Sequence, residues 1–136
     1  MTLTPGPVDS QEKATPGAID ANAIEKFLVT DSGLKYRILR NGDGKKPIAS
    51  SRVTVHYKGW LDDESIFDSS YRRNETISFG LNQVIKGWTE GMQLVGVGGM
   101  IELEIPYQLG YGERGSPGAI PPRANLHFIV ELFDMK

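Results

Sequence analysis

The sequence of 136 residues contains no cysteine, which excludes disulfide bonds, thiol nucleophiles and thiolate metal sites. It also contains no apolar run near the roughly 20 residues that a membrane-spanning helix needs. Its first 20 residues combine neither a basic start nor an apolar stretch, so they do not resemble a signal peptide. We therefore expect a cytoplasmic protein with no membrane association, although an exported protein without its leader would have the same features.

The sequence also lacks a large excess of either charge, because it has 15 Lys and Arg residues and 17 Asp and Glu residues, for a net charge of -2. Nucleic-acid binding depends on a basic surface that follows the phosphates, so we expect no nucleic-acid partner. The two histidines, His56 and His127, lie singly at outward positions of strand patterns, where surface histidines are common. No cluster of ligands or phosphate-binding loop is present, and we expect neither a metal nor a cofactor.

Large apolar residues are scarce at the N-terminus, where Pro5, Pro7 and Pro16 stand among glycines and polar residues. This composition predicts a disordered arm over residues 1–31. Within it, "DANAIEKFL" could form a short helix at 21–28, which would persist only if its apolar face docked on something. The remaining residues, 32–136, are predicted to form one domain.

The rest of the chain alternates apolar and polar residues with a period of two, which is typical of strands in a sheet with one wet side. The segments with this pattern are 33–40, 51–61, 65–70, 75–81, 98–106 and 125–135. One short amphipathic segment, 83–92, has a helical pattern instead. Several strands with a single helix indicate an α+β fold, in which the helix covers the apolar side of an antiparallel sheet.

The segment 107–124 is a long connection between two strands, rich in glycine and proline. Loops longer than about 12–15 residues without regular structure are usually functional or disordered. This loop holds Tyr107, Tyr111 and Ile120, which a free linker would not need. We therefore interpret it as functional.

The helix pattern "QVIKGWTEGM" contains Gly87 and Gly91, although a glycine inside a helix costs about 0.5–1 kcal/mol relative to alanine. The two glycines are four residues apart, so they lie together at one edge of the apolar arc centred on Trp88. We interpret them as a smooth shoulder that a neighbouring strand can approach closely, which leaves the indole uncrowded.

A set of aromatic and aliphatic residues accompanies these elements without any nucleophile beside it. Its members are Tyr57, Phe67, Phe79, Val84, Ile85, Trp88, Tyr111, Ile120 and Phe128. Most of them could simply form the core. Asp68 is unusual because it follows Phe67 in an apolar strand, where an unpaired carboxylate is costly. Arg73 could pair with it and favour its charged form, and the Tyr57 hydroxyl could donate to it.

The motifs "VHYKG", "FDSS", "VIKGWTEG" and "YGERGSPGAIPPRANLHFIVEL" occur in this order over residues 32–136. In this combination the chain resembles the FKBP-type peptidyl-prolyl cis-trans isomerases and is similar to their bacterial Mip-like branch. The resemblance implies a five- to six-stranded antiparallel sheet wrapped around one short helix, with a ligand pocket between them. Ile77 stands where the family usually has an aromatic residue, and Phe79 follows two positions later.

The resemblance also implies roles for individual residues. Trp88 would form the pocket floor, Tyr111 would reach the ligand with its hydroxyl, and Asp68 would lie at the rim, supported by Arg73. The residues expected to act in catalysis are Asp68, Tyr111, Ile85, Trp88 and Phe128. The residues expected to contact the substrate are Tyr57, Phe67, Phe79, Val84 and Ile120.

These features predict a monomeric isomerase that acts on X-Pro bonds in polypeptides and binds macrolides such as tacrolimus and rapamycin. Two alternatives stay open at this point. The pocket and the loop 107–124 could hold a partner without catalysis, or the protein could act mainly as a folding helper that grips unfolded chains. The complete aromatic set favours the isomerase.

Overall fold

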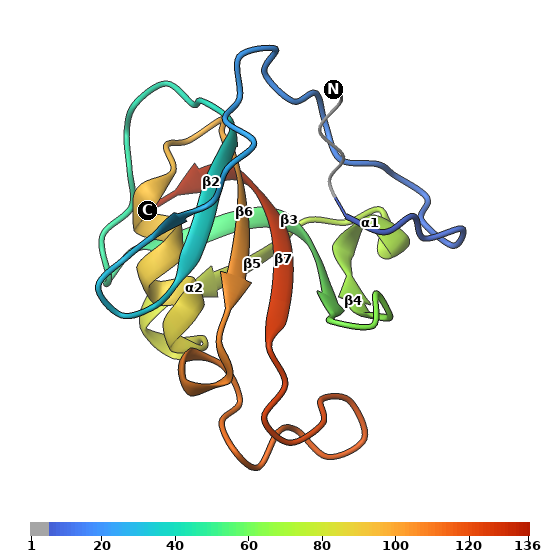
Figure 1. Cartoon of the computed structure of the whole chain (residues 1–136). Helices are drawn as coiled ribbons and strands as arrows, with labels where there is room; N and C mark the ends of the chain where they lie inside the picture. Colours follow the sequence, from blue (N-terminus) through green and yellow to red (C-terminus); the bar gives the residue numbers. More distant parts are fainter. Residues whose placement is uncertain (1–5) are drawn as a thin grey trace.

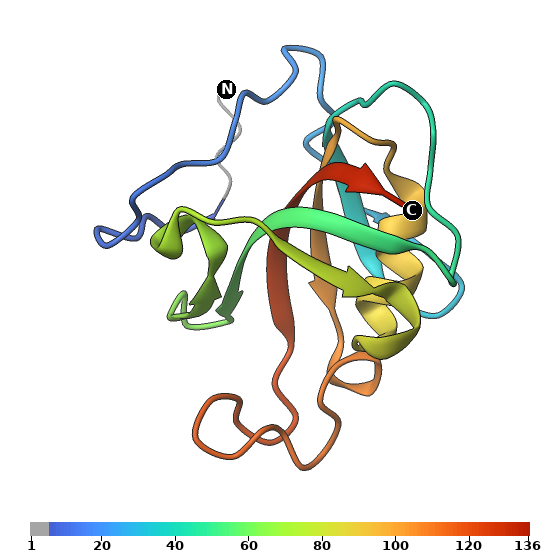
Figure 2. The same cartoon turned by 180° about the vertical axis from the view of Figure 1, so that it is seen from behind.

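The computed structural model describes residues 6–136, which form a twisted antiparallel sheet that curves around one short helix (Figures 1 and 2). Within these residues the sheet has seven strands in the order β1-β2-β6-β7-β3-β4, and β5 pairs with β3 beside β4. The strands are β1 (Leu28–Val29), β2 (Lys35–Arg40), β3 (Arg52–Leu61), β4 (Ile66–Ser69), β5 (Ile77–Gly80), β6 (Met100–Ile105) and β7 (Leu126–Met135). The predicted fold class is confirmed, and the additional strand is the two-residue β1.

The helices are short. They are α1 (Ser70–Arg73) and α2 (Lys86–Gly91), and three 3₁₀ turns lie at Leu81–Gln83, Met92–Leu94 and Tyr107–Leu109. Helix α2 lies across the concave face of the sheet, as the helical period of its sequence predicts (Figure 1). Helix α1 lies between two of the predicted strand segments, where no helix was expected, and the Ser69 hydroxyl caps it by accepting from the Arg72 N–H. No helix within residues 6–136 has the length and apolarity needed to span a bilayer.

A strand packs directly against the side of α2 that holds Gly87 and Gly91, as predicted from these two glycines. A Cβ atom added at Gly87 would lie 2.6 Å from a methyl carbon of Ile105, and one at Gly91 would lie 2.7 Å from Leu103. Both partners belong to β6, which therefore rests directly on the helix backbone. The close approach explains why a helix this short has two glycines despite their cost.

The main core lies between α2 and the concave face, and a second, smaller apolar cluster lies on the opposite face of the sheet. The second cluster contains Leu39, Trp60, Met100 and Ile129, and Ile19 of the arm packs against it. Apolar residues at these outward positions need a cover, and the arm supplies it.

The structure gives residues 6–31, for which the composition predicted a disordered arm, a defined path along the sheet (Figure 2). Residues 1–5 lie outside the described part of the chain. One signal in the sequence points to this cover, because Leu39 breaks the alternation of segment 33–40 and places an apolar residue on the face expected to contact water. The domain boundary at residue 32 stays a prediction. Strand β1, which precedes residue 32, already pairs with β2.

The short helix predicted at 21–28 is also absent. Asp20 does not cap a helix; its N–H donates to the Leu39 carbonyl and its carboxylate accepts from the Asn41 N–H. Leu28 and Val29 pair with β2 as a strand, and Phe27 packs under the guanidinium of Arg37, 4.8 Å from the ring centre. Pairing to an existing sheet edge outcompetes an isolated two-turn helix, which is marginal in water.

Candidate active site

A cavity of about 520 Å³ opens between the start of α2 and the concave face of the sheet. Its position follows from the fold, because β3, β4, β5 and β7 each direct side chains toward the helix from one face. The lining residues are Tyr57, Phe67, Asp68, Phe79, Gln83, Val84, Ile85, Trp88, Tyr111 and Phe128. Residues from four strands, a 3₁₀ turn, the start of α2 and the loop after β6 thus meet around this cavity.

The indole of Trp88 is held in a fixed orientation at the bottom of this cavity. The rings of Tyr57, Phe79 and Phe128 meet it nearly at right angles, with centroid distances of 5.4, 5.6 and 5.4 Å. Phe67 meets Phe128 in the same way at 5.5 Å. Edge-to-face contacts of this kind stabilise aromatic pairs beyond simple burial. The cavity therefore has rigid, mainly apolar walls.

One expected substrate contact, Ile120, does not line the cavity. Ile120 is buried in the core, 5% exposed, where its backbone pairs with Ser116 in the loop after β6. Arg73, expected as a support, lies behind Asp68 and pairs with it at 2.9 Å. One lining residue, Gln83, was missed, because a polar residue before a helix carries no signal that it faces a cavity.

The carboxylate of Asp68 is the charged group at the rim, with its side chain 38% exposed. It accepts hydrogen bonds from the Tyr57 hydroxyl, from Arg73 at 2.9 Å and from the Ser69 N–H at 2.8 Å. Partial burial opposes its ionisation, but the hydrogen bonds from Arg73 and Tyr57 outweigh burial and hold the pKa of Asp68 below its ordinary value of 3.8. Asp68 is therefore an anion at neutral pH.

The tyrosine that donates to Asp68 is held in its neutral form. Burial, followed by the hydrogen bond to the Asp68 carboxylate, raises the pKa of Tyr57 to about 12. A general acid or base works best when its pKa lies near the working pH. Neither member of this pair meets that condition. The Asp68–Tyr57 pair is therefore suited to fixing the positions of these side chains and the electrostatic field at the rim rather than to moving a proton.

Polar anchors for a bound chain lie at the edges of the cavity. Ile85 is the N-cap of α2, and its carbonyl accepts from the Trp88 and Thr89 N–H groups. Its own N–H donates to no other group of residues 6–136, as the first amides of a helix commonly do not. Tyr111 is 42% exposed on the loop that follows β6 and lines the cavity from the other side.

Within the residues that the structure describes, no three His, Cys, Asp or Glu side chains gather as metal ligands. His56 stacks on Tyr71 and bonds to Ser70, and His127 bonds to Asp62 at 2.7 Å. Both histidines lie outside the cavity.

Residues 44–133 match the family model described as FKBP-type peptidyl-prolyl cis-trans isomerase. This match covers every residue that lines the cavity. The chain belongs to the FKBP family. The resemblance seen in the sequence motifs is thereby confirmed, and we refer to residues 44–133 as the FKBP domain.

Three relatives illustrate the similarity of this FKBP protein to bacterial members. It is 47% identical over 106 residues to the FKBP-type 22 kDa peptidyl-prolyl cis-trans isomerase of Escherichia coli (strain K12), covering 78% of this chain and 52% of the relative. It is 52% identical over 126 residues to FkpA of Aeromonas hydrophila, covering 92% and 46%. It is 43% identical over 105 residues to the peptidyl-prolyl cis-trans isomerase Mip of Coxiella burnetii, covering 77% and 46%.

Solved structures show the same fold for this FKBP domain. The crystal structure of FkpA from Escherichia coli superposes with a TM-score of 0.80 at 45% identity, covering 83% of this chain and 53% of that one. A peptidyl-prolyl cis-trans isomerase from Pseudomonas syringae pv. tomato superposes with a TM-score of 0.75 at 35% identity, covering 93% and 86%. The chain spans about half the length of the curated relatives described above.

Proposed function

We propose that this protein is a peptidyl-prolyl cis-trans isomerase that accelerates rotation about X-Pro bonds in polypeptides and so assists folding. The observation that carries the proposal is the aromatic cavity over Trp88, whose charged rim group, Asp68, is already hydrogen-bonded to Tyr57 and Arg73. The family names of its relatives support the same activity.

The reaction suits such a cavity because it needs no nucleophile, proton donor or cofactor. Rotation about an amide must break resonance, at a barrier of about 18–20 kcal/mol. The twisted amide has lost the charge separation of resonance, so it is less polar than the planar cis or trans amide. A dry aromatic cavity therefore binds the twisted amide better, and each 1.36 kcal/mol of this preference accelerates rotation tenfold.

The polar groups at the edge would hold the peptide during rotation. We assign the free N–H of Ile85 to one substrate carbonyl and the Tyr111 hydroxyl to another. The prolyl ring would sit on Trp88, between the rings of Tyr57 and Phe128. Asp68 would orient Tyr57 and set the local field, and it would not act as a general acid, because its low pKa keeps it charged.

We expect catalytic amounts of the full chain to accelerate cis-trans exchange of a peptide such as Ala-Leu-Pro-Phe, because both isomers of an X-Pro bond are populated and the uncatalysed exchange takes tens of seconds or longer. NMR exchange spectroscopy measures the rate directly, and a protease-coupled assay provides an independent value. No acceleration at micromolar protein would rule out the isomerase and leave a binding role for the cavity.

We also propose that tacrolimus and rapamycin occupy this cavity, and we expect them to quench the fluorescence of Trp88. The only other tryptophan, Trp60, stacks on His127 against the opposite face of the sheet. Quenching should therefore persist in Trp60→Phe and disappear in Trp88→Phe. The reverse pattern, or no ligand-dependent change in either variant, would contradict the assignment of the cavity.

A further inference from the structure

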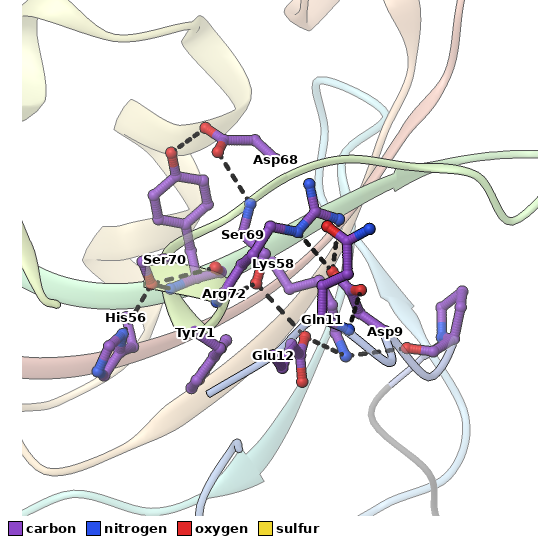
Figure 3. A network of polar contacts seen from close by, with 12 residues as sticks. Asp9, Gln11, Glu12, His56, Lys58, Asp68, Ser69, Ser70, Tyr71 and Arg72 are labelled. Carbon is purple, nitrogen blue, oxygen red and sulfur yellow. Dashed lines mark hydrogen bonds and ion pairs between the residues drawn. The ribbon is translucent and has the colours of Figure 1, made fainter. Parts of the chain in front are cut away.

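The N-terminal arm does more than cover apolar surface, because residues 7–14 form a set of polar contacts with β3, β4 and α1 (Figure 3). We call this segment the clasp. Its side chains and backbone bond to the far side of the same strand pair that directs Tyr57 and Asp68 into the cavity. The clasp and the cavity are thus on opposite faces of one piece of sheet.

The centre of these contacts is Lys58, a residue of β3 that is only 3% exposed. Its ammonium group lies 3.0 Å from the Glu12 carboxylate and donates to the Pro7 carbonyl at 2.9 Å. Both partners belong to the clasp. A buried cation requires such partners, since an unpaired charge is costly away from water. Lys58, which follows Tyr57 in β3, therefore ties the clasp to this strand.

Helix α1 is held from two sides. On the β3 side, the Ser70 hydroxyl bonds to the Tyr57 N–H at 2.7 Å and the ring of His56 stacks on Tyr71. On the clasp side, the Lys13 and Ala14 N–H groups both donate to the Tyr71 carbonyl at 3.1 Å, and Asp9 pairs with Arg72. A helix of four residues has no stability of its own, so its position depends on these external contacts.

The position of α1 decides how the Asp68 carboxylate is held. Arg73, the last residue of α1, donates to it at 2.9 Å, and the N–H of Ser69, the residue that caps α1, donates at 2.8 Å. The Ser69 hydroxyl also lies 3.4 Å from the Glu12 carboxylate. A continuous path of contacts therefore runs from the clasp through α1 and its cap to the rim of the cavity (Figure 3).

We propose that Glu12 is a positioning residue for the reaction. It holds Lys58, Ser69 and α1 so that the Asp68–Tyr57 pair keeps the geometry required at the rim of the cavity. Glu12 lies on the opposite face of the sheet from the cavity and touches no substrate. This role rests on the proposed isomerase activity, because Asp68 matters for turnover only if the cavity is catalytic.

The test compares Glu12→Ala with Glu25→Ala in the full chain. Glu25 is an exposed carboxylate of the same arm whose side chain bonds to no other residue of 6–136, so it is the matched control. Each change is made in the wild-type background and in Asp68→Asn, which removes the group through which Glu12 is proposed to act. The readouts are kcat/KM on the prolyl peptide, corrected for the folded fraction, and the free energy of unfolding in urea.

If Glu12 acts through Asp68, the two substitutions will not be independent. We expect Glu12→Ala to lower kcat/KM by about five-fold in the wild-type background and by less than about two-fold in Asp68→Asn, which corresponds to a coupling of about 0.5 kcal/mol or more. Glu12→Gln should recover part of the loss, because its amide oxygen still accepts from Lys58. An equal loss in both backgrounds, or no loss in the wild type, would overturn the proposal. Should Glu12→Ala fail to fold, Asp9→Ala removes the acceptor of Arg72 from the same clasp and must show the same coupling.

A spectroscopic readout keeps this inference separate from the proposed activity. The ¹³C shift of the Asp68 carboxyl carbon and the guanidinium signals of Arg73 should move in Glu12→Ala and stay in place in Glu25→Ala. If the wild-type chain does not accelerate exchange at all, the proposed function fails, and these signals still decide whether the clasp positions Asp68. Unchanged signals in Glu12→Ala would overturn the positioning role whatever the activity.

Discussion

Gly91→Leu is expected to lower the free energy of unfolding by about 3 kcal/mol, because inserting a large side chain into a filled contact forces helix and strand apart. Even a Cβ atom at Gly91 would lie 2.7 and 2.9 Å from the two methyl carbons of Leu103, below the distances that real contacts show. Leu103 is fully buried in β6, so it has no free space to move into. Thermal unfolding should show a drop on the order of 10 °C.

Lys86→Leu provides the matched control for this substitution. Lys86 is the first residue of the same helix, and its side chain is exposed. The same added side chain should therefore change the melting temperature little, since exposed substitutions usually stay within about 0.5 kcal/mol. A melting temperature of Gly91→Leu within a degree or two of wild type would show that β6 does not rest on the glycine shoulder.

The largest expected effect on activity comes from Phe128→Ala, which we expect to lower kcat/KM by on the order of 10- to 100-fold. Phe128 meets both Trp88 and Phe67 edge to face, so its removal frees the indole and opens the cavity wall to water. Water solvates the planar amide better than the twisted one and removes the preference on which the proposed catalysis depends. Stopped-flow or NMR exchange rates per folded molecule measure the loss.

Stability and catalysis must be separated in this experiment, because Phe→Ala in a core costs about 3–5 kcal/mol by itself. Leu126→Ala is the matched control. Leu126 lies two residues earlier on β7 and is fully buried, but it does not line the cavity. We expect a comparable loss of stability with kcat/KM per folded molecule nearly unchanged. Equal losses of activity in the two variants would show that Phe128 contributes packing and nothing specific to the cavity.

Much of the domain could be predicted from sequence because its signals are local. The period of two in β3, β6 and β7 and the helical period of α2 each depend on neighbouring residues alone. The aromatic set was visible for the same reason, because Tyr57 and Phe128 alternate toward one face of their strands and Trp88 lies at the centre of the apolar arc of its helix. Asp68 stood out as a carboxylate in an apolar strand, and its partners, Tyr57 and Arg73, were correctly inferred.

Which residues of the loop after β6 line the cavity, in contrast, depends on how that loop folds back onto the sheet. Ile120 and Tyr111 looked alike in sequence, since both are large residues in a Gly/Pro-rich loop. The structure buries Ile120 in the core and leaves Tyr111 at the cavity. Gln83 lines the cavity only because a 3₁₀ turn places it there. No periodic pattern reports such positions.

The sequence by itself determined the fold class, the helix with its glycine shoulder and most of the residues around Trp88. Only the tertiary structure decided the path of the arm and the contacts of its clasp. Glu12 and Lys58 are far apart in the chain, and nothing local predicts that they meet. They pair because the folded sheet buries Lys58, and a buried cation is stable only beside an anion that some other part of the chain must bring to it.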